Sequence, residues 1–249
     1  MQWRSIVAMG SASCGELAAV FNPAWVFWKL VIDIATFLGW TILVLFVAGT
    51  DGTVTALEWA LSHLVNSSRV LKKAQMEIDI VVGNDRLIDE SDLRKLPYLQ
   101  SIITEALRMH PPSPLLLPHE SSEECIVGGF RVPRGTMLHV NAWAIQNDPH
   151  VWADPTEFRP ERFQEMEEAK DGIKFLPFGY GRRSCPGEGM TLRMLGLALG
   201  SLIQFFEWES FGEKIVDMNE TSGFTAPKLK PLKVLCRCRP SMLNLLSRI

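Results

Sequence analysis

Cysteine is scarce in this sequence, and several common signatures are missing. The 249 residues contain five cysteines, too few and uneven in number for a disulfide-stapled scaffold. Glycine and proline occur at average frequency, with 18 and 15 residues, which excludes collagen-like and low-complexity classes. A formal net charge of −3 gives no basic character, so we expect no nucleic-acid partner. After these exclusions, the composition is that of a globular protein, and the few cysteines indicate a reducing compartment.

Targeting and membrane signals are also weak. Met1–Trp28 lacks the combination of a basic start, a short apolar core and a cleavage site that marks a signal peptide. The run Ile34–Ala48 carries no charge, but its fifteen residues fall short of the roughly 20 that span a bilayer as a helix. We therefore expect a buried core helix here, with a membrane span as the alternative.

Helical periodicity dominates the first hundred residues and returns near the C-terminus. Apolar residues three and four apart predict a helix over Val70–Val82 and another over Leu96–His110, which Pro111–Pro112 ends. Leu57–Leu64 continues helically after the apolar run, and Glu188–Phe206 predicts a long apolar helix.

Strand signals are short. We expect strands or hairpins at Leu115–Leu117, Cys125–Val132, Thr136–Val140 and Leu229–Cys238. The hairpin turns at Gly128–Gly129. Residues 147–181 are rich in proline and aspartate and predict a functional loop with buried aromatic side chains. Together these elements predict an α+β fold that is mainly helical with small β-sheets.

The stretch Phe178–Gly187 places a single cysteine, Cys185, in a glycine-rich turn directly before the last long helix. The helix dipole, free backbone N–H groups and two neighbouring arginines all favour the thiolate, which is the form that binds metal. A small buried hydrophobe is the ordinary alternative for a lone cysteine. Phosphate binding is a further alternative, although the spacing and the Gly-Lys-Ser/Thr ending of a P-loop are absent.

Two charged patterns precede this turn. Glu105 and Arg108 are spaced i and i+3 on one helix face, and such a pair on a surface is worth a few tenths of a kcal/mol. Arg162, within Phe158–Phe163, can join them in a buried network, but the residues alone favour a solvated loop.

The segment Ala48–Thr53 places glycines and threonines inside a helical pattern. Each mid-helix glycine costs about 1 kcal/mol relative to alanine. The cluster predicts either a kink that admits a ligand or a helix end with a Thr/Asp cap, and the residues do not separate the two.

Taken in this order, these stretches resemble the C-terminal half of a cytochrome P-450, the haem-thiolate monooxygenase superfamily. The family's haem loop, Phe-x-x-Gly-x-Arg-x-Cys-x-Gly, is matched at Phe178, Gly181, Arg183, Cys185 and Gly187. Its Glu-x-x-Arg helix is matched by Glu105 and Arg108, and its Pro-Glu-Arg-Phe segment by Pro160–Phe163. Leu57–Ala60, Leu96–Leu99, Val132–Gly135 and Val140–Ala144 look like the plant group that contains isoflavone hydroxylases, enzymes of secondary metabolism.

The resemblance implies roles for these residues. Cys185 would bind the iron of haem b as an axial thiolate, and Phe178 would pack beside that thiolate. Arg183 and His119 match positions that contact the haem propionates. Glu105, Arg108 and Arg162 match a buried ion network that holds the loop.

The resemblance assigns Ala48–Thr53 to the helix on the distal side of the haem. Ala48 and Gly49 would leave room for oxygen, and Asp51 would serve proton delivery. Gly52 stands where the family has its first threonine, and Thr53 follows about 100° further round the helix. This departure predicts poor coupling of oxygen reduction to product formation.

The resemblance also implies partners and a location. These are an NADPH-cytochrome P-450 reductase, a small apolar substrate, and the cytosolic face of the endoplasmic reticulum membrane. Residues 32–249 would form the C-terminal haem-binding portion of a P-450 domain, and residues 1–31 remain unassigned. We expect the usual N-terminal anchor and the substrate-side half to be absent. The alternative function is therefore a non-catalytic fragment that keeps the haem-thiolate loop and exposes apolar surface.

Overall fold

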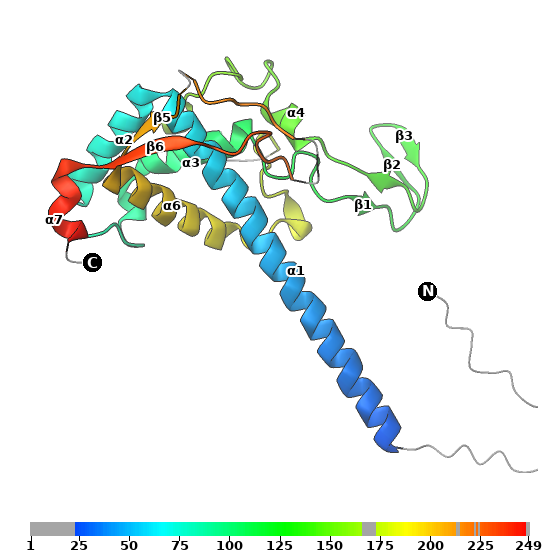
Figure 1. Cartoon of the computed structure of the whole chain (residues 1–249). Coiled ribbons are helices and arrows are strands. Elements are labelled where there is room, and N and C mark those ends of the chain that lie inside the picture. The colour runs from blue at the N-terminus through cyan, green and yellow to red at the C-terminus, as the bar shows by residue number, and fades with distance from the viewer. Residues whose placement is uncertain (1–22, 166–172, 213–214, 222, 224, 248–249) are drawn as a thin grey trace, which may run out of the picture. The chain divides into compact units, whose positions relative to one another are not determined.

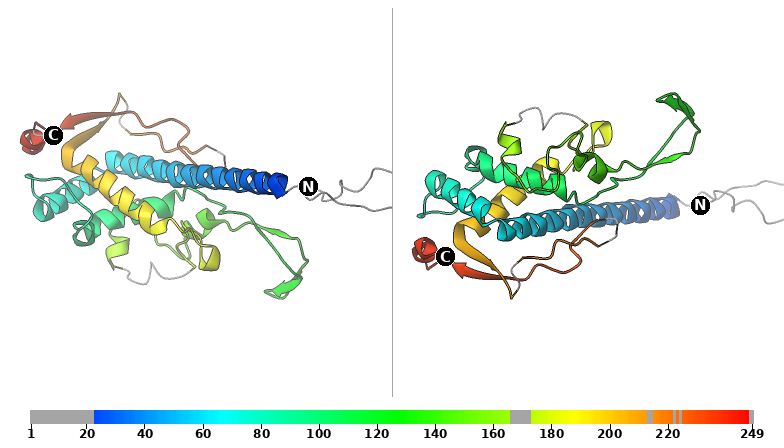
Figure 2. Two further views of the ribbon diagram at one scale, coloured as in Figure 1. Left: turned by 90° about the horizontal axis from the view of Figure 1, so that it is seen from below. Right: turned by 90° about the horizontal axis from the view of Figure 1, so that it is seen from above.

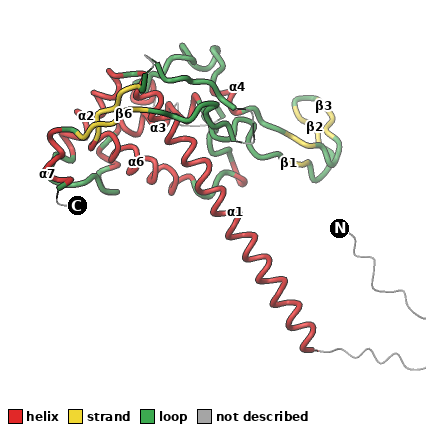
Figure 3. Tube along the Cα trace, in the orientation of Figure 1, coloured by secondary structure: helices red, strands yellow, loops and turns green. Residues whose placement is uncertain are grey.

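The computed structural model describes residues 23–165, 173–212, 215–221, 223 and 225–247. Residues 1–22, which make up most of the unassigned N-terminal segment, lie outside this description. The chain divides into two compact units, Met1–Leu45 and Phe46–Ile249. Helices predominate over short strand pairs in the described chain (Figure 3), which confirms the mainly α fold class with small β-sheets.

The helices are named in chain order (Figure 1). Their bounds are α1 Pro23–Asn66, α2 Ser68–Val81, α3 Pro97–Met109, α4 Ala142–Gln146, α5 Arg162–Glu165, α6 Glu188–Phe205 and α7 Leu243–Leu246. Short 3₁₀ turns cover Leu93–Lys95, Gly181–Arg183 and Pro240–Met242. The predicted helices over 70–82, 96–110 and 188–206 are confirmed as α2, α3 and α6, with ends shifted by one or two residues.

The strands form three antiparallel pairs. They are β1 His119–Glu120 with β4 Met137–Leu138, β2 Cys125–Val127 with β3 Phe130–Val132, and β5 Phe206–Ser210 with β6 Val234–Cys238. Gly128 and Gly129 connect β2 to β3 with φ values of 58° and 86°. Positive φ at both central residues is what a two-residue hairpin turn requires, so the predicted hairpin is confirmed. Figure 2 shows this hairpin at the tip of a long excursion.

The predicted strand at Leu115–Leu117 is wrong. Leu116 has a φ of 51°, and its N–H donates to the carbonyl of Ser113 at 3.1 Å. Prolines at positions 114 and 118 flank the segment and remove the backbone donors that a ladder needs. The chain therefore turns here, and the strand begins two residues later at His119.

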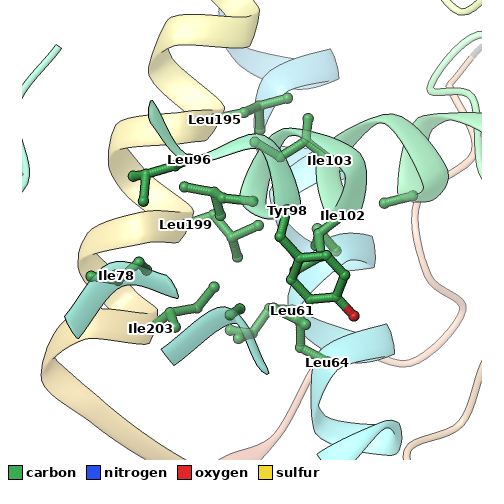
Figure 4. Packing of buried hydrophobic residues seen from close by; sticks show 14 of the residues in the cluster. Leu61, Leu64, Ile78, Leu96, Tyr98, Ile102, Ile103, Leu195, Leu199 and Ile203 are labelled. Carbon is green, nitrogen blue, oxygen red and sulfur yellow. The ribbon is translucent and has the colours of Figure 1, made fainter. Parts of the chain in front are cut away.

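One core of Phe46–Ile249 lies where α2, α3, α6 and the C-terminal part of α1 meet. Fully or nearly buried residues include Leu64, Ile78, Leu96, Leu99, Ile102, Leu195, Leu199 and Ile203. Leu195, Leu199 and Ile203 of α6 point into this space in Figure 4, because residues four apart share one helix face. This packing fixes α3, which carries Glu105 and Arg108, against α6, which begins just after Cys185.

A carboxylate from α2 holds the beginning of α3. The two Glu77 oxygens accept hydrogen bonds from the backbone N–H groups of Tyr98 and Leu99, at 2.8 and 2.9 Å. The first turn of a helix has N–H groups without partners inside the helix, and the helix dipole also stabilises a negative charge at this end. Glu77 therefore sets the position of α3 from a neighbouring helix.

The expectation of a buried helix over Ile34–Ala48 is wrong. The segment is helical as part of α1, but every described side chain from Thr36 to Ala48 is exposed. Periodicity could not show this, because an all-apolar helix has the same pattern in a protein core and outside one. The general expectation of exposed apolar surface agrees with the structure, because Ile42–Val47 is exposed.

Candidate functional site

The Glu105 carboxylate of α3 is the centre of a buried ion network. Its oxygens accept hydrogen bonds from Arg108 Nε at 2.7 Å and Nη2 at 3.0 Å, and from Arg162 Nε at 3.0 Å. The backbone N–H of Arg159 donates to the same carboxylate at 3.0 Å. Glu105 and Arg108 are 0% exposed and Arg162 is 2% exposed. Such burial requires every charge to be paired.

The two guanidinium groups use their other N–H groups on backbone carbonyls. Arg108 donates to the carbonyls of Gln146 and Pro155, both at 2.8 Å. Arg162 donates to the carbonyl of Ala153 at 2.7 Å and also bonds two further carbonyls of the same loop. The residues alone favoured a surface pair and a solvated loop for these side chains. The structure shows instead that both arginines are buried. They can be buried because carbonyl groups of the irregular loop accept their remaining N–H groups.

Gln146, at the end of α4, connects this network to the segment before the cysteine loop, a role that no sequence pattern predicted. Its side chain is 0% exposed and donates to the carbonyls of Leu107 and Arg108 at 3.1 and 2.9 Å. Its Oε1 accepts from the N–H of Leu176 at 2.7 Å. A single buried amide thus joins α3 to the segment that precedes Phe178.

Aromatic side chains pack around the same loop. Trp152 and Phe163 are buried, with ring centroids 5.7 Å apart, and Phe163 lies 5.6 Å from Phe175. The Arg108 guanidinium lies 5.4 Å from the Trp152 ring centroid, within the range of a cation–π contact. The expectation of buried aromatic side chains in this loop is confirmed for Trp152 and Phe163, whereas Phe158, Phe175 and Phe178 are partly buried.

The loop Phe178–Gly187 turns sharply before α6. Gly179 and Gly181 have φ values of 74° and 75°, a region that side chains with a Cβ disfavour. The N–H of Cys185 donates to the carbonyl of Phe178 at 2.8 Å, which closes the turn. A Cβ built on Gly187 would lie 3.7 Å from Cys185 Sγ, so Gly187 lies directly beside the thiol.

The Cys185 side chain is exposed and forms no disulfide. Arg182 and Arg183 are exposed in the 3₁₀ turn, and in the described chain neither guanidinium has a hydrogen-bonded partner. Across the described residues no group of three or more His, Cys, Asp or Glu side chains gathers as a metal site. The loop therefore offers one thiol donor with two free cations close to it in the chain.

A cavity of about 830 Å³ lies between this loop and α3. Its walls include Ile103 and Leu107 of α3, Phe178 of the loop and Leu192 of α6. Gly179–Gly181 and Ser184 of the loop also line the cavity, whereas Cys185 does not.

The remaining predicted residues lie elsewhere. Ala48, Gly49 and Asp51 are exposed on α1, and the Thr53 hydroxyl donates to the Gly49 carbonyl at 2.9 Å. His119 is exposed on β1, opposite Leu138. No hydrogen bond between described residues joins these positions to the cysteine loop. The structure brings together Glu105, Arg108 and Arg162, and among the described residues no hydrogen bond joins the distal segment or His119 to them.

A cluster of histidines and aromatic rings occupies the other end of α3. Trp59 and His110 are stacked with ring centroids 3.8 Å apart, and His63 stacks on Phe158 at 4.3 Å. His110 Nδ1 lies 2.6 Å from a Glu220 carboxylate oxygen. His63 Nε2 is buried with no hydrogen-bond partner among the described residues. Burial, and then the nearby charges of His110, Lys228 and Arg108, hold the pKa of His63 well below 6.5.

Comparison with known proteins identifies the class. The family model "Cytochrome P450" matches residues 38–234. A zebrafish cytochrome P450 solved with abiraterone superposes with a TM-score of 0.73 and 34% identity, over 79% of this chain and 46% of that one. The chain therefore belongs to the cytochrome P450 family.

Plant proteins are among its similar relatives. Cytochrome P450 81D1 of Arabidopsis thaliana is 54% identical over 83% of this chain and 40% of its own length. Isoflavone 2'-hydroxylase of Medicago truncatula is 49% identical over 80% and 39%. (+)-Piperitol/(+)-sesamin synthase CYP81Q2 of Sesamum radiatum is 51% identical over 84% and 41%. The chain thus spans about two fifths of the length of these relatives.

The buried network predicts a large loss of stability when its centre is neutralised. Glu105→Gln leaves Arg108 and Arg162 buried without a counter-charge, and should lower the free energy of unfolding by about 3–5 kcal/mol. The control is Glu124→Gln, which removes the exposed Glu124–Arg131 pair and should cost less than about 1 kcal/mol. Urea denaturation of both variants measures the difference, and equal losses would contradict a central role for Glu105.

Burial of His63 predicts a pH-dependent stability. Below about pH 6.5, His63 takes up a proton in the unfolded chain. In the folded chain His63 stays neutral over part of this range, because folding lowers its pKa. Stability is therefore full above pH 6.5 and falls as the pH drops towards the folded pKa. His63→Phe should reduce that slope by up to about 1.4 kcal/mol per pH unit. Denaturation between pH 7.5 and 5 tests this, with the exposed His139→Phe as the control, which should leave the slope unchanged.

Proposed function

We propose that this chain acts in haem-dependent monooxygenation. One atom of dioxygen would enter a small apolar substrate and the other would leave as water, with two electrons from NADPH through a flavoprotein reductase. The observation that carries this proposal is the exposed Cys185 thiol in a glycine turn at the start of α6, connected to a fully buried ion network.

The residues present fit a haem-thiolate group. A thiolate is a soft ligand suited to iron, and one protein donor would be enough because a haem brings its own nitrogen ligands. The Cys185 thiol is free and exposed, and Gly187 beside it carries no side chain that would cover the sulfur. When bound, the haem would supply the redox chemistry that activates dioxygen.

The other residues of this chain would hold and support that group. Arg183 and His119, both exposed, would bind the propionates with a positive charge and a ring N–H. Phe178 would pack beside the thiolate, and its carbonyl already accepts the Cys185 N–H. Glu105, Arg108 and Arg162 would keep the loop in position.

On the distal side, Ala48 and Gly49 would leave space for oxygen, since beyond the neighbouring backbone of α1 itself no described atom lies within 4 Å of a Cβ built on Gly49. Asp51 would deliver protons. The Thr53 hydroxyl is bonded to the Gly49 carbonyl, which agrees with a hydroxyl that does not replace the family threonine at position 52. Residues 32–249 would form the haem-binding portion, acting at the cytosolic face of the endoplasmic reticulum membrane.

A second candidate is a chain that keeps the haem-thiolate loop without turnover. The observation that favours it is Gly52, which stands where the family has a threonine and leaves that position of α1 without a hydroxyl. Haem binding and turnover are separate measurements, so the two candidates are distinguishable.

Reconstitution with haem tests the proposal directly. The reduced protein with carbon monoxide should show the red-shifted Soret band of a thiolate-ligated haem, and Cys185→Ala should abolish that band. Cys236→Ala, which removes another exposed free cysteine, should leave it intact. A chain that takes up no haem, or a band typical of a neutral ligand, would refute the assignment of Cys185.

Gly52 allows a test of coupling in the reconstituted protein with its reductase. A Cβ at this position would lie 3.7 Å from Pro112 Cβ, an ordinary van der Waals contact, so a Cβ is accommodated there. Gly52→Thr should lower the peroxide released per NADPH oxidised, by on the order of tenfold or more if the hydroxyl positions a proton. Gly52→Val has the same shape without the hydroxyl and should give no such fall, and equal values for the two variants would exclude the hydroxyl.

A further inference from the structure

Both ends of the Gln146 side-chain amide bond to the backbone, and their partners come from two different segments. Nε2 donates to the carbonyls of Leu107 and Arg108 at 3.1 and 2.9 Å, and Oε1 accepts from the N–H of Leu176 at 2.7 Å. The two carbonyls belong to the last turn of α3, where a helix has no partner of its own for them, and both residues are buried. Gln146 therefore supplies partners to backbone groups that solvent does not reach.

Leu176 begins a short series of backbone contacts that ends at Cys185. Leu176 is 4% exposed, and its carbonyl accepts from the N–H of Gly179 at 3.1 Å. The N–H of Cys185 in turn donates to the carbonyl of Phe178 at 2.8 Å. Every residue from position 180 to position 186 is exposed, so the buried Leu176 is the anchor from which the cysteine loop extends.

The hydrogen bond between Gln146 and Leu176 fixes how this anchor is oriented. Among the described residues, it is the one hydrogen bond that joins residues 173–187 to a part of the chain other than α6, which follows them. The side chains of Phe175 and Phe178 also pack against the core, but apolar contact is non-directional. A hydrogen bond weakens when its angle changes, so the Gln146 amide holds the Leu176 peptide group in one orientation.

We propose that Gln146 is a positioning residue for Cys185, which holds the peptide group of Leu176 in the orientation from which the loop presents the thiol to haem iron. Gln146 acts through the backbone, because its own bonds end at Leu176. The role of the thiol as an iron ligand rests on the proposed function, whereas the order of the loop is measurable in the chain without haem. The two can therefore fail separately.

Two buried amides in this chain provide a variant and its matched control. Gln146→Met removes the amide and keeps a side chain of similar size. Gln204 of α6 is also 0% exposed and bonds the backbone in the same pattern. Its Oε1 accepts from the N–H of Ile88 at 3.2 Å, and its Nε2 donates to the carbonyls of Gly83 and Arg86 at 3.3 and 3.0 Å. Gln204→Met therefore removes a comparable amide whose partners lie outside the cysteine loop.

Hydrogen–deuterium exchange of the full chain without haem gives the first measurement. Gln146→Met should speed exchange at the backbone N–H groups of Gly179 and Cys185 roughly 5- to 150-fold, which corresponds to the loss of about 1–3 kcal/mol for a buried hydrogen bond. Gln204→Met should leave both rates unchanged. Gln146→Asn keeps an amide that is one methylene too short to join both segments, and it replaces the Met variant if that variant does not fold. Equal rates at Cys185 in the wild type and the Gln146 variant would overturn the proposal.

The spectrum of the reconstituted chain gives the second measurement. In the reduced protein with carbon monoxide, Gln146→Met should lower the ratio of the thiolate band to the neutral-ligand band by roughly fivefold or more. Gln204→Met should keep the wild-type ratio. An unchanged ratio in Gln146→Met would overturn the proposal, and so would an equal fall in Gln204→Met, because that fall would reflect general destabilisation. A wild type that binds no haem would refute the proposed function, and the exchange rates would still decide whether Gln146 orders the loop.

Discussion

The buried carboxylate of Glu105 is the interaction on which the geometry around Cys185 depends. A carboxylate with no exposure is stable only when its oxygens are fully paired, and here the partners come from α3 itself, from Arg162 and from the backbone at Arg159. Because Arg159 and Arg162 lie 54 and 57 residues further along the chain, one side chain fixes a helix and an irregular loop together. The loop needs such a constraint, since it has little regular hydrogen bonding of its own.

Hydrogen bonds to the backbone connect this network to the loop that carries the Cys185 thiol. Gln146 bonds α3 on one side and Leu176 on the other, and the N–H of Gly179 donates to the carbonyl of Leu176 at 3.1 Å. The turn then closes through Cys185 and Phe178. A rigid, buried polar scaffold thus supports a loop whose functional side chains remain exposed, which is the usual division between a positioning framework and a binding loop.

The sequence was sufficient to predict those elements whose conformation is determined by neighbouring residues. The spacing of apolar residues predicted α2, α3 and α6, and Gly128–Gly129 predicted the hairpin, because period and turn chemistry act within a few residues. The role of Gln146 could not be predicted from the sequence. Its amide joins α3 to the segment at Leu176, and these segments are neighbours only in the folded chain. The burial of Arg162 was missed for the same reason, and the family resemblance alone suggested it.

Helix α1 shows that a sequence pattern cannot distinguish a buried apolar helix from an exposed one. Its apolar residues continue from an exposed N-terminal part into a buried C-terminal part. Trp59 and Leu64 are 0% exposed, whereas Phe37 and Ile42 are 70% and 66% exposed, yet both parts read alike as apolar helix. Asp51 marks the change between them. Contacts with distant parts of the chain separate the two halves of α1. The Trp59 ring N–H donates to the carbonyl of Ala226 at 2.9 Å, and Leu64 belongs to the core that α1 shares with α2, α3 and α6. A pattern of neighbouring residues cannot contain such contacts, because they join segments that lie far apart in the sequence.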